Sequence, residues 1–236
     1  MTETVNFALP LVQPAQAQKH VTVNEALARL DALGQLVIQS RSVTAPPPTQ
    51  SEGLVHAVPA GAVNEWAGQA GKLAVLANGG WVFVTPGPGW RGWIADEHQP
   101  AVFDGSAWRG GALALAPSGA GTFVRVQEFD HEIGAGAQSP TVQALPANVL
   151  LFAVSARVVV PVTGTLASWR LGMDAAEDRF GTGLGTGLGA FGRGLLGAPM
   201  ALYQSETLLL TAEGGDFAGG TVRLAAHYAE FSLPGL

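Results

Sequence analysis

Glycine and proline punctuate this chain throughout, and they limit how long its helices and strands can run. The 32 glycines and 15 prolines make up about a fifth of the 236 residues, well above average usage. Both residues interrupt regular helices, so this composition favours many short strands joined by turns. Apolar residues still make up 47% of the chain, which is enough for a substantial core.

The segment from Gly53 to Trp108 has the pattern of short strands separated by turns such as Asn78-Gly79-Gly80 and Asp104-Gly105. It holds five of the six tryptophans, Trp66, Trp81, Trp90, Trp93 and Trp108. These rings either fill the core of a small domain or lie exposed and stack on sugars.

The run Gly89-Trp90-Arg91-Gly92-Trp93 favours exposure, because two rings three residues apart cannot easily both face one small core. The candidate glycan-binding residues are therefore Trp90, Trp93, Trp108 and Arg91.

A longer β-region follows the small residues of Gly110–Gly121. Strand alternation over Phe123–Phe129 places Phe123, Arg125, Gln127 and Phe129 on one face and Val124, Val126 and Glu128 on the other. Near the end of the chain, apolar residues recur at every second position: Val222, Leu224, Ala226 and Tyr228. Six or more strands in about 115 residues, with turn-rich connections and no strand–helix alternation, predict a jelly-roll-like β-sandwich. The fold class predicted for the whole chain is mainly β.

The N-terminal stretch Phe7–Leu36 differs in texture from both β-regions. Phe7, Leu9, Leu11 and Val12 lie among prolines, so this part is expected to be extended and to dock on the chain's own body or on another subunit. Thr22 and Glu25 have the spacing of a helix capping box. The apolar residues after them recur at helical steps, as in Leu27, Leu30 and Leu33. That helix packs on its own domain or forms a seam for self-association.

Three consecutive prolines, Pro46–Pro48, predict a stiff spacer and a domain boundary. We therefore expect an attachment segment with an oligomerisation helix over residues 1–45 and a tryptophan-rich β-domain over 46–110. A linker over 111–121 and a β-sandwich over 122–236 complete the expected organisation.

Charge and composition exclude several classes of function. A net charge of −6 and a pI near 5.3 argue against nucleic acid as the main partner. The absence of cysteine removes disulfides, thiolate metal sites and cysteine nucleophiles. No secretory signal and no membrane-spanning run is recognised, so we expect a protein made in the cytoplasm without membrane insertion.

The remaining motifs do not define an enzyme. Gly187, Gly189 and Gly192 satisfy G-x-G-x-x-G within the tract Gly181–Gly197, but the strand–helix context of a nucleotide site is missing. This tract is either a glycine loop between strands or a place where backbones pack closely around an oligomer axis. The five histidines lack metal-ligand spacing. Asp174, Glu177 and Asp178 are expected in a solvated loop or in a salt bridge to Arg179 or Arg170. The sequence calls for no catalytic residue, metal or cofactor.

Three stretches resemble a known family: FALPLVQPAQAQKHVTVNEALARLDAL near the start, GWRGWIADE followed by FDGSAW, and SWRLGMDAAEDRFGTGLG. This is an uncharacterised family of tail-fibre-associated proteins from bacterial prophages and gene transfer agents, which are phage-like particles. The resemblance implies a virion protein, a tail-fibre or head-spike component at the particle periphery. It also implies other virion proteins as partners and a homo-oligomer, most commonly a trimer.

The resemblance and the residue patterns together predict a non-enzymatic role in host attachment. The N-terminal residues Phe7, Leu9, Leu11, Val12, Leu27, Leu30 and Leu33 are the candidates for attachment and oligomerisation. The β-domains are expected to bind cell-surface polysaccharide. Two alternatives are a structural connector that binds only other particle proteins and a glycan-degrading tailspike enzyme.

Overall fold

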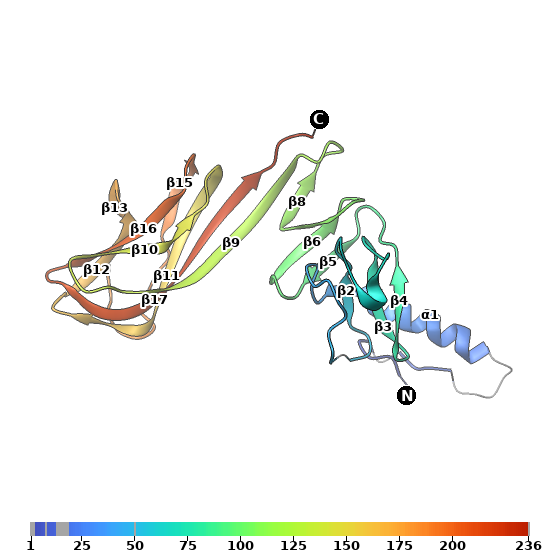
Figure 1. Cartoon of the computed structure of the whole chain (residues 1–236). Helices are drawn as coiled ribbons and strands as arrows, with labels where there is room; N and C mark the ends of the chain where they lie inside the picture. Colours follow the sequence, from blue (N-terminus) through green and yellow to red (C-terminus); the bar gives the residue numbers. More distant parts are fainter. Residues whose placement is uncertain (1–2, 8, 13–18, 50, 236) are drawn as a thin grey trace. The chain divides into compact units, whose positions relative to one another are not determined.

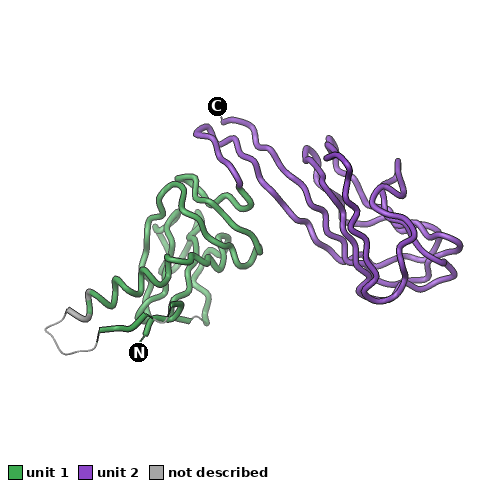
Figure 2. The backbone as a smooth tube through the Cα atoms, turned by 180° about the vertical axis from the view of Figure 1, so that it is seen from behind, with its two compact units in different colours: residues 1–112 green, residues 113–236 purple. Residues whose placement is uncertain are grey.

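The computed structural model describes residues 3–7, 9–12, 19–49 and 51–235. The chain divides into two compact units, Met1–Ala112 and Leu113–Leu236 (Figure 2). The predicted mainly β class is confirmed, since one α-helix and seventeen strands make up the regular structure of the described residues.

Unit 1 is built on a seven-stranded sheet in the order β4-β3-β2-β1-β5-β6-β7 (Figure 1). The short strand β1 lies at its centre and runs parallel to both β2 and β5, while the remaining pairs are antiparallel. The elements of this unit are α1 (Lys19–Gly34), β1 (Val37–Ile38), β2 (Val55–Ala57), the 3-10 helix η1 (Asn64–Trp66), β3 (Leu73–Ala77), β4 (Gly80–Val84), β5 (Arg91–Ile94), β6 (Gln99–Phe103) and β7 (Trp108–Gly110).

The expected boundary at Ala45/Pro46 does not separate two bodies. Pro46–Pro48 connect β1 to β2, which are neighbours in the same sheet. Backbone hydrogen bonds close the connection on both sides, from Gln39 N–H to the Val55 carbonyl and from Ala57 N–H to the Ser40 carbonyl. The prolines therefore act as a rigid connection inside unit 1.

Unit 1 contains two apolar clusters. The larger one joins the end of the helix to the sheet and includes Ala32, Leu36, Ile38, Val55, Leu73, Ile94, Phe103 and Trp108. The smaller one lies around Trp66, whose ring is fully buried. Its ring centroid is 5.2 Å from that of His56 and 5.1 Å from that of Trp81, so large aromatics fill a core that short strands cannot supply.

Helix α1 differs from its prediction at both ends and in its buried side. It begins at Lys19, before Thr22, and ends at Gly34, so the capping-box prediction at Thr22 is wrong. Asp31 and Ala32 are buried, whereas Leu30 is 59% exposed and Leu27 and Leu33 are half-buried. Of the three expected seam residues, only Leu33 packs against the larger cluster.

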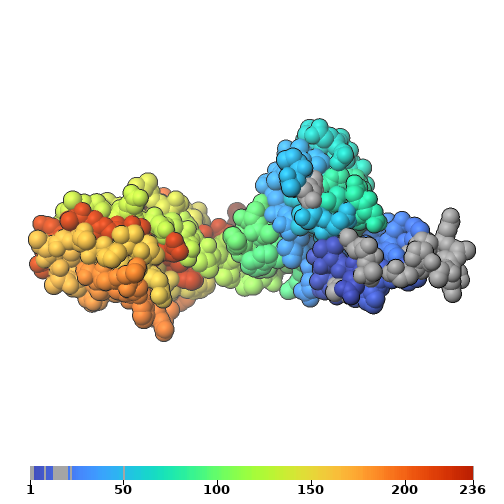
Figure 3. All heavy atoms as spheres, turned by 90° about the horizontal axis from the view of Figure 1, so that it is seen from below, coloured from blue at the N-terminus to red at the C-terminus, as the bar shows by residue number. Residues whose placement is uncertain are grey.

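The N-terminal segment docks on helix α1 of the same chain, which answers the alternative that the sequence left open (Figure 3). The Asp31 carboxylate accepts hydrogen bonds from the Thr4 hydroxyl at 2.7 Å, the Asn6 N–H at 2.7 Å and the Phe7 N–H at 2.5 Å. Further along, the Asn24 side chain bonds both the N–H and the carbonyl of Val12. Pro14, which was also expected in this extended part, lies outside the described residues.

Unit 2 consists of two sheets, one in the order β10-β16-β12-β13 and one in the order β14-β11-β17-β9-β8, with β15 also paired to β11. Its strands are β9 (Gly121–Glu132), β10 (Gln138–Leu145), β11 (Val149–Gly164), β12 (Ser168–Met173), β13 (Ala176–Leu184), β14 (Phe191–Gly192), β15 (Leu195–Leu202), β16 (Glu206–Glu213) and β17 (Phe217–Phe231), with β8 (Ala112–Leu115) at the edge next to β9.

The strand order identifies a jelly roll. With β9 counted as the first strand and β14 and β15 together as the sixth, one sheet pairs the first, eighth, third and sixth strands. The other sheet pairs the second, seventh, fourth and fifth, the two-sheet arrangement produced by a pair of Greek keys. One cluster of buried residues fills the space between the sheets, including Trp169 of β12, Leu210 of β16 and Leu224 of β17.

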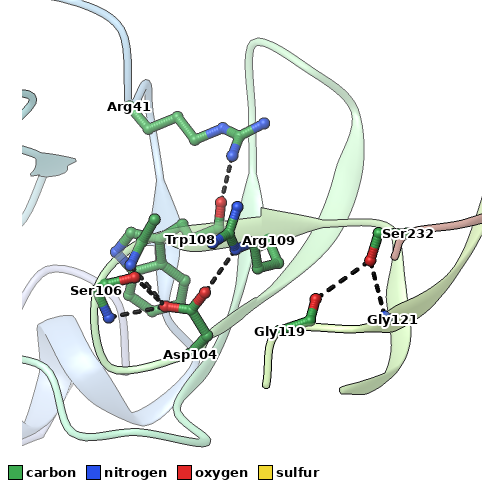
Figure 4. A network of polar contacts seen from close by, with 9 residues as sticks. Arg41, Asp104, Ser106, Trp108, Arg109, Gly119, Gly121 and Ser232 are labelled. Carbon is green, nitrogen blue, oxygen red and sulfur yellow. Dashed lines mark hydrogen bonds and ion pairs between the residues drawn. The ribbon is translucent and has the colours of Figure 1, made fainter. Parts of the chain in front are cut away.

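The expected linker over 111–121 is largely regular structure. Residues up to Leu115 form β8, a turn follows in which Ala116 N–H bonds the Ala120 carbonyl, and β9 begins at Gly121. Ser232, just after β17, fastens this turn: its hydroxyl accepts a hydrogen bond from Gly121 N–H and donates one to the Gly119 carbonyl (Figure 4).

The first residues of the glycine tract, up to Leu184, end strand β13, and the residues from Thr186 onward lie along strand β11 and begin the sixth strand of the jelly roll. Gly194 shows why glycine is needed there. Its φ is +46°, and a Cβ would lie 2.0 Å from the Val154 carbonyl oxygen. The tract therefore allows close backbone packing within this chain.

Candidate carbohydrate-binding surfaces

Strand β5 carries two of the predicted residues on one side of the sheet. Arg91 and Trp93 are two positions apart, so they share a face, and both are exposed, Trp93 by 42%. The intervening Gly92 points to the core, because a Cβ there would lie 3.1 Å from the Leu36 side chain. We call the exposed side of this strand, with its cross-strand neighbours Val37 and Pro100, the β5 face.

The β5 face presents an apolar row with a cation beside it. Val37, Trp93 and Pro100 lie directly across from one another on three neighbouring strands, and all three are exposed. Arg91 lies one row away, opposite Val102. An indole next to a guanidinium can stack on the apolar face of a sugar and bond its hydroxyl groups.

Trp90 is exposed but does not extend the same platform. It lies one residue before β5, so alternation directs it to the opposite side from Arg91 and Trp93. It is 36% exposed, and its indole lies over Gly87, where a Cβ would be 3.0 Å from Nε1. The two rings that the sequence placed together are thus both accessible, but on different sides of the strand.

Trp108 is not an exposed platform. It is 5% exposed, and its ring centroid lies 5.4 Å from that of Phe103 in the larger cluster of unit 1. The Asp104–Trp108 turn explains this position. Asp104 accepts hydrogen bonds from the N–H groups of Ser106 and Ala107 and from the Arg109 side chain, which fixes the turn and directs Trp108 inward (Figure 4).

The same turn forms one wall of a cleft in unit 1. The cleft has a volume of about 740 Å³ and is lined by Arg41, Val58, Pro59, Glu97, Ser106 and Trp108, among others. This volume is within the range of small-ligand pockets. Trp108 is therefore part of the buried wall of this cleft and is not an exposed ring.

An ion pair lies at the polar side of this cleft. Arg41 Nε is 2.6 Å from Glu97 Oε1, and Arg41 Nη2 is 2.8 Å from Glu97 Oε2. Arg41 also donates a hydrogen bond to the Trp108 carbonyl (Figure 4). Sequence reasoning missed this pair, because the two residues are far apart in the chain and no local motif joins them. Since each charge neutralises the other, the cleft suits an uncharged polar ligand.

Unit 2 has an open cleft of about 590 Å³ between β9 and β10. His131 Nε2 lies 2.9 Å from Ser139 Oγ inside it, and both residues are buried. Burial lowers the pKa of His131, although its hydrogen bond to Ser139 acts in the opposite direction. Asp130 and Glu132 lie on the other side of β9 by alternation. The pair therefore has no acidic orienting group from its neighbours in sequence, unlike a serine–histidine–acid triad.

Residues predicted for attachment lie at the surface of unit 1. Phe7 is 41% exposed and also contacts the helix, because a Cβ on Gly34 would lie 2.8 Å from its ring. Val12 is 45% exposed, and Leu9 and Leu11 are half-buried. Together with Leu30, they leave apolar surface on the outside of the docked segment and helix.

The described residues form neither a metal-binding cluster nor a membrane-spanning helix. The described residues contain no group of three or more histidine, aspartate or glutamate side chains arranged to hold a metal ion. In the part of the chain that the structure covers, no helix has the length and apolar content needed to span a bilayer.

The fold and these surfaces define a mainly β protein with a C-terminal jelly roll and accessible aromatic and basic side chains. Residues 23–109 match the model of a family described as protein of unknown function (DUF2793). A structure titled "Cyanophage Pam1 capsid asymmetric unit" matches with a TM-score of 0.36 at 18% identity, covering 50% of this chain and 92% of that one. No curated protein sequence matches the chain.

Proposed function

We propose that the protein is a structural component of a phage-like particle, a fibre or spike protein that binds host cell-surface polysaccharide without catalysis. The three stretches quoted above support the particle assignment through their resemblance to tail-fibre-associated proteins. The jelly roll of unit 2 is compatible with it, because viral capsid and lectin domains use this fold. That second argument is an analogy between folds and identifies no site.

The observation that carries the polysaccharide assignment is the β5 face. Trp93 is 42% exposed on a strand in the middle of a sheet, where a large apolar ring is costly to leave in water. The guanidinium of the adjacent Arg91 forms no hydrogen bond or ion pair with a described residue. A ring and a donor group that both remain available favour a sugar as the ligand. Weak single sites are sufficient when a particle displays many copies.

Attachment and self-association belong to the N-terminal surface of unit 1. The exposed side of helix α1 carries Val23 and Leu30, which are 42% and 59% exposed and lie seven residues apart on the same face. Phe7 and Val12 extend this apolar surface on the docked segment. We propose that it contacts other particle proteins and neighbouring copies of the chain in a trimer.

Two experiments test the function. Purified particles from cells that express an epitope-tagged copy should contain the protein, and its absence from them would overturn the particle assignment. Immobilised host polysaccharide should capture the purified full chain, and Trp93→Ala should weaken capture about fivefold or more, given the energy of stacking on an aromatic ring. Phe231→Ala, which removes an exposed aromatic ring of unit 2 outside the β5 face, is the control.

The same experiments distinguish an attachment protein from a structural connector that binds only other particle proteins. If the protein is incorporated into particles but host polysaccharide is not bound, a role limited to contacts with other particle proteins replaces the attachment role. Leu30→Glu should reduce incorporation and shift light scattering from trimer to monomer, because a charge would lie in the proposed seam. Unchanged incorporation and an unchanged trimer would exclude the exposed side of helix α1 as the seam.

A further inference from the structure

The glycine tract of unit 2 carries a cluster that neither the sequence patterns nor the β5 face accounts for. Phe191 and Arg193 are its aromatic and basic residues, and Phe191 on β14 pairs across the sheet with Arg157 on β11. The Arg157 Cζ lies 5.7 Å from the centroid of the Phe191 ring, and the Arg193 Cζ lies 6.0 Å from it. We call these three residues the Phe191 cluster.

The backbone around the Phe191 cluster is fixed. Val158 N–H bonds the Ala190 carbonyl at 2.8 Å, and Val154 N–H bonds the Gly194 carbonyl at 3.1 Å, one on each side of the cluster. Gly192 lies between the two side chains, where a Cβ would be 3.0 Å from Leu184. The tract therefore holds Phe191 and Arg193 on one side of a strand that packs closely against the jelly-roll body.

The Phe191 cluster is exposed and its positive charge is not neutralised internally. Phe191 is 57% exposed, and both arginines are exposed. Neither guanidinium forms a hydrogen bond or ion pair with any described residue. By contrast, Arg223, which lies opposite Arg157 on β17, is paired with Asp130 at 2.7 and 2.9 Å.

Five other arginines are paired with carboxylates, which distinguishes them from the two arginines of the Phe191 cluster. Arg41, Arg109, Arg125 and Arg170 are each paired with a carboxylate, and the net charge is −6. Two guanidinium groups beside one accessible ring are therefore a local positive site. Such a pair bonds a carboxylate through planar N–H forks, while the exposed part of a ring contacts the C–H face of a sugar.

We propose that the Phe191 cluster binds an anionic polysaccharide whose repeat carries a carboxylate, as in a polyuronate. This proposal rests on the polysaccharide-binding function above and names the charge class of one ligand. Duplex DNA also offers anions, but it carries one charge per about 1.7 Å of its axis, a higher density than one carboxylate per sugar ring, so the acidic chain repels it more strongly. One carboxylate next to one sugar ring matches two arginines next to one phenylalanine.

The test measures binding of the full chain to polygalacturonate, with dextran as the neutral polymer and duplex DNA as the alternative polyanion. Polygalacturonate should bind and dextran should not bind at this site. Arg157→Gln and Arg193→Gln should each weaken binding about tenfold or more, since each removes a charge-assisted contact. Phe191→Ala should weaken it roughly fivefold, and raising the salt should weaken it further.

Arg179→Gln is the matched control, because Arg179 is an exposed arginine of the same unit and the change in net charge is the same. It should leave the affinity within about twofold, as expected for an exposed charge away from the site. Equal losses in Arg179→Gln and Arg157→Gln would overturn the proposal in favour of a general charge effect. Duplex DNA that binds as tightly as polygalacturonate, with the same sensitivity to Arg157→Gln, would also overturn it.

The outcomes separate this inference from the proposed function. If host polysaccharide binding depends on Trp93 and not on Arg157 or Arg193, the attachment function stands and the Phe191 cluster is excluded. If polygalacturonate binding depends on the cluster while the protein is absent from particles, the site stands and the particle assignment is overturned.

Discussion

The two units of this chain are both β-structures, but they obtain their cores in different ways. In unit 1 the described strands have two to five residues, and aromatic groups such as His56, Trp66 and Trp81 supply the packing. In unit 2 strands β9, β11 and β17 have 12, 16 and 15 residues, and one continuous cluster lies between two sheets. Long strands bring many side chains to one face, whereas short strands need a few large ones.

Glycine is used differently in the two units. In unit 1, Gly61, Gly68, Gly71 and Gly79 have positive φ and open space around the position of a Cβ, so they serve the turns. In unit 2, a Cβ added to Gly172 or Gly194 would lie about 2 Å from a backbone oxygen. Glycines with positive φ and open space occur in unit 2 as well, for example Gly189, so glycine serves turns in both units and also close backbone packing in unit 2.

Gly194→Ala should break unit 2 and is the largest effect we expect. The new methyl group would meet the Val154 carbonyl at 2.0 Å and Phe180 at 2.9 Å, at a φ of +46°. The cost should be about 4 kcal/mol or more, as for the largest single-residue effects, measured by chemical denaturation. Gly187→Ala is the control, with nothing within 4 Å of its Cβ. Similar stabilities of the two variants would contradict the close-packing role.

Trp66→Ala should be the strongest single aromatic change in unit 1. Trp66 is fully buried between His56 and Trp81, so its loss should cost about 3–5 kcal/mol. Trp93→Ala, at an exposed site, should change stability by less than about 1 kcal/mol. Calorimetry of both variants checks this, and a small effect of Trp66→Ala would show that large aromatics do not dominate the core of unit 1.

Asp31→Ala should release the N-terminal segment at a cost of about 2–3 kcal/mol, since it leaves several partly buried donors without an acceptor. Burial alone would raise the pKa of Asp31, but hydrogen bonds from Asn6, Thr4 and Phe7 outweigh it and lower the pKa from 3.8. Because the folded-state pKa is lowered, the stabilisation is complete above the unfolded value and is lost as pH falls through the folded value. Hydrogen exchange at the Asn6 and Phe7 amides measures the release of the segment and its pH dependence, with Asp216→Ala as a control.

The smallest effect concerns one buried histidine in each unit. Burial lowers the pKa of His56, opposed by the charge of Asp96, and burial also lowers the pKa of His131. A neutral buried histidine binds protons less readily folded than unfolded. Stability is therefore full above about pH 6.5 and falls as pH drops toward the folded value. His56→Phe should remove this dependence from unit 1 alone, and a persisting slope there would exclude His56 as its source.

Local patterns in the sequence were sufficient to predict the long strands. Phe129 and His131 of β9 face inward as alternation requires, and Val222, Leu224 and Ala226 of β17 are fully buried. Each of these strands is long enough to show a period of two. The jelly-roll prediction followed from the number and spacing of such strands, and the strand order confirms it.

Non-local pairing explains most of what the sequence did not show. Val37–Ile38 is too short to display a period, so its place at the centre of a sheet leaves no local trace. Trp108 follows a turn like an exposed loop tryptophan, but Asp104 fixes that turn so that the ring points inward. Glycine has no side chain that could show strand alternation. The sequence therefore did not predict that Phe191 lies in a strand next to its partner Arg157. Exposure of Trp90 and Trp93 was predicted, because their spacing could be judged locally.

The central position of β1 has a consequence for the order in which unit 1 forms during synthesis. Val37 and Ile38 leave the ribosome early, but one of their two neighbours is β5, which ends at Ile94. Until then, a two-residue strand has one open hydrogen-bonding edge, and Leu36 and Ile38 lack part of their eventual cover. Pairing across such a separation is slow compared with hairpin formation. The nascent chain must therefore keep β1 without one of its two neighbours until synthesis has reached Ile94.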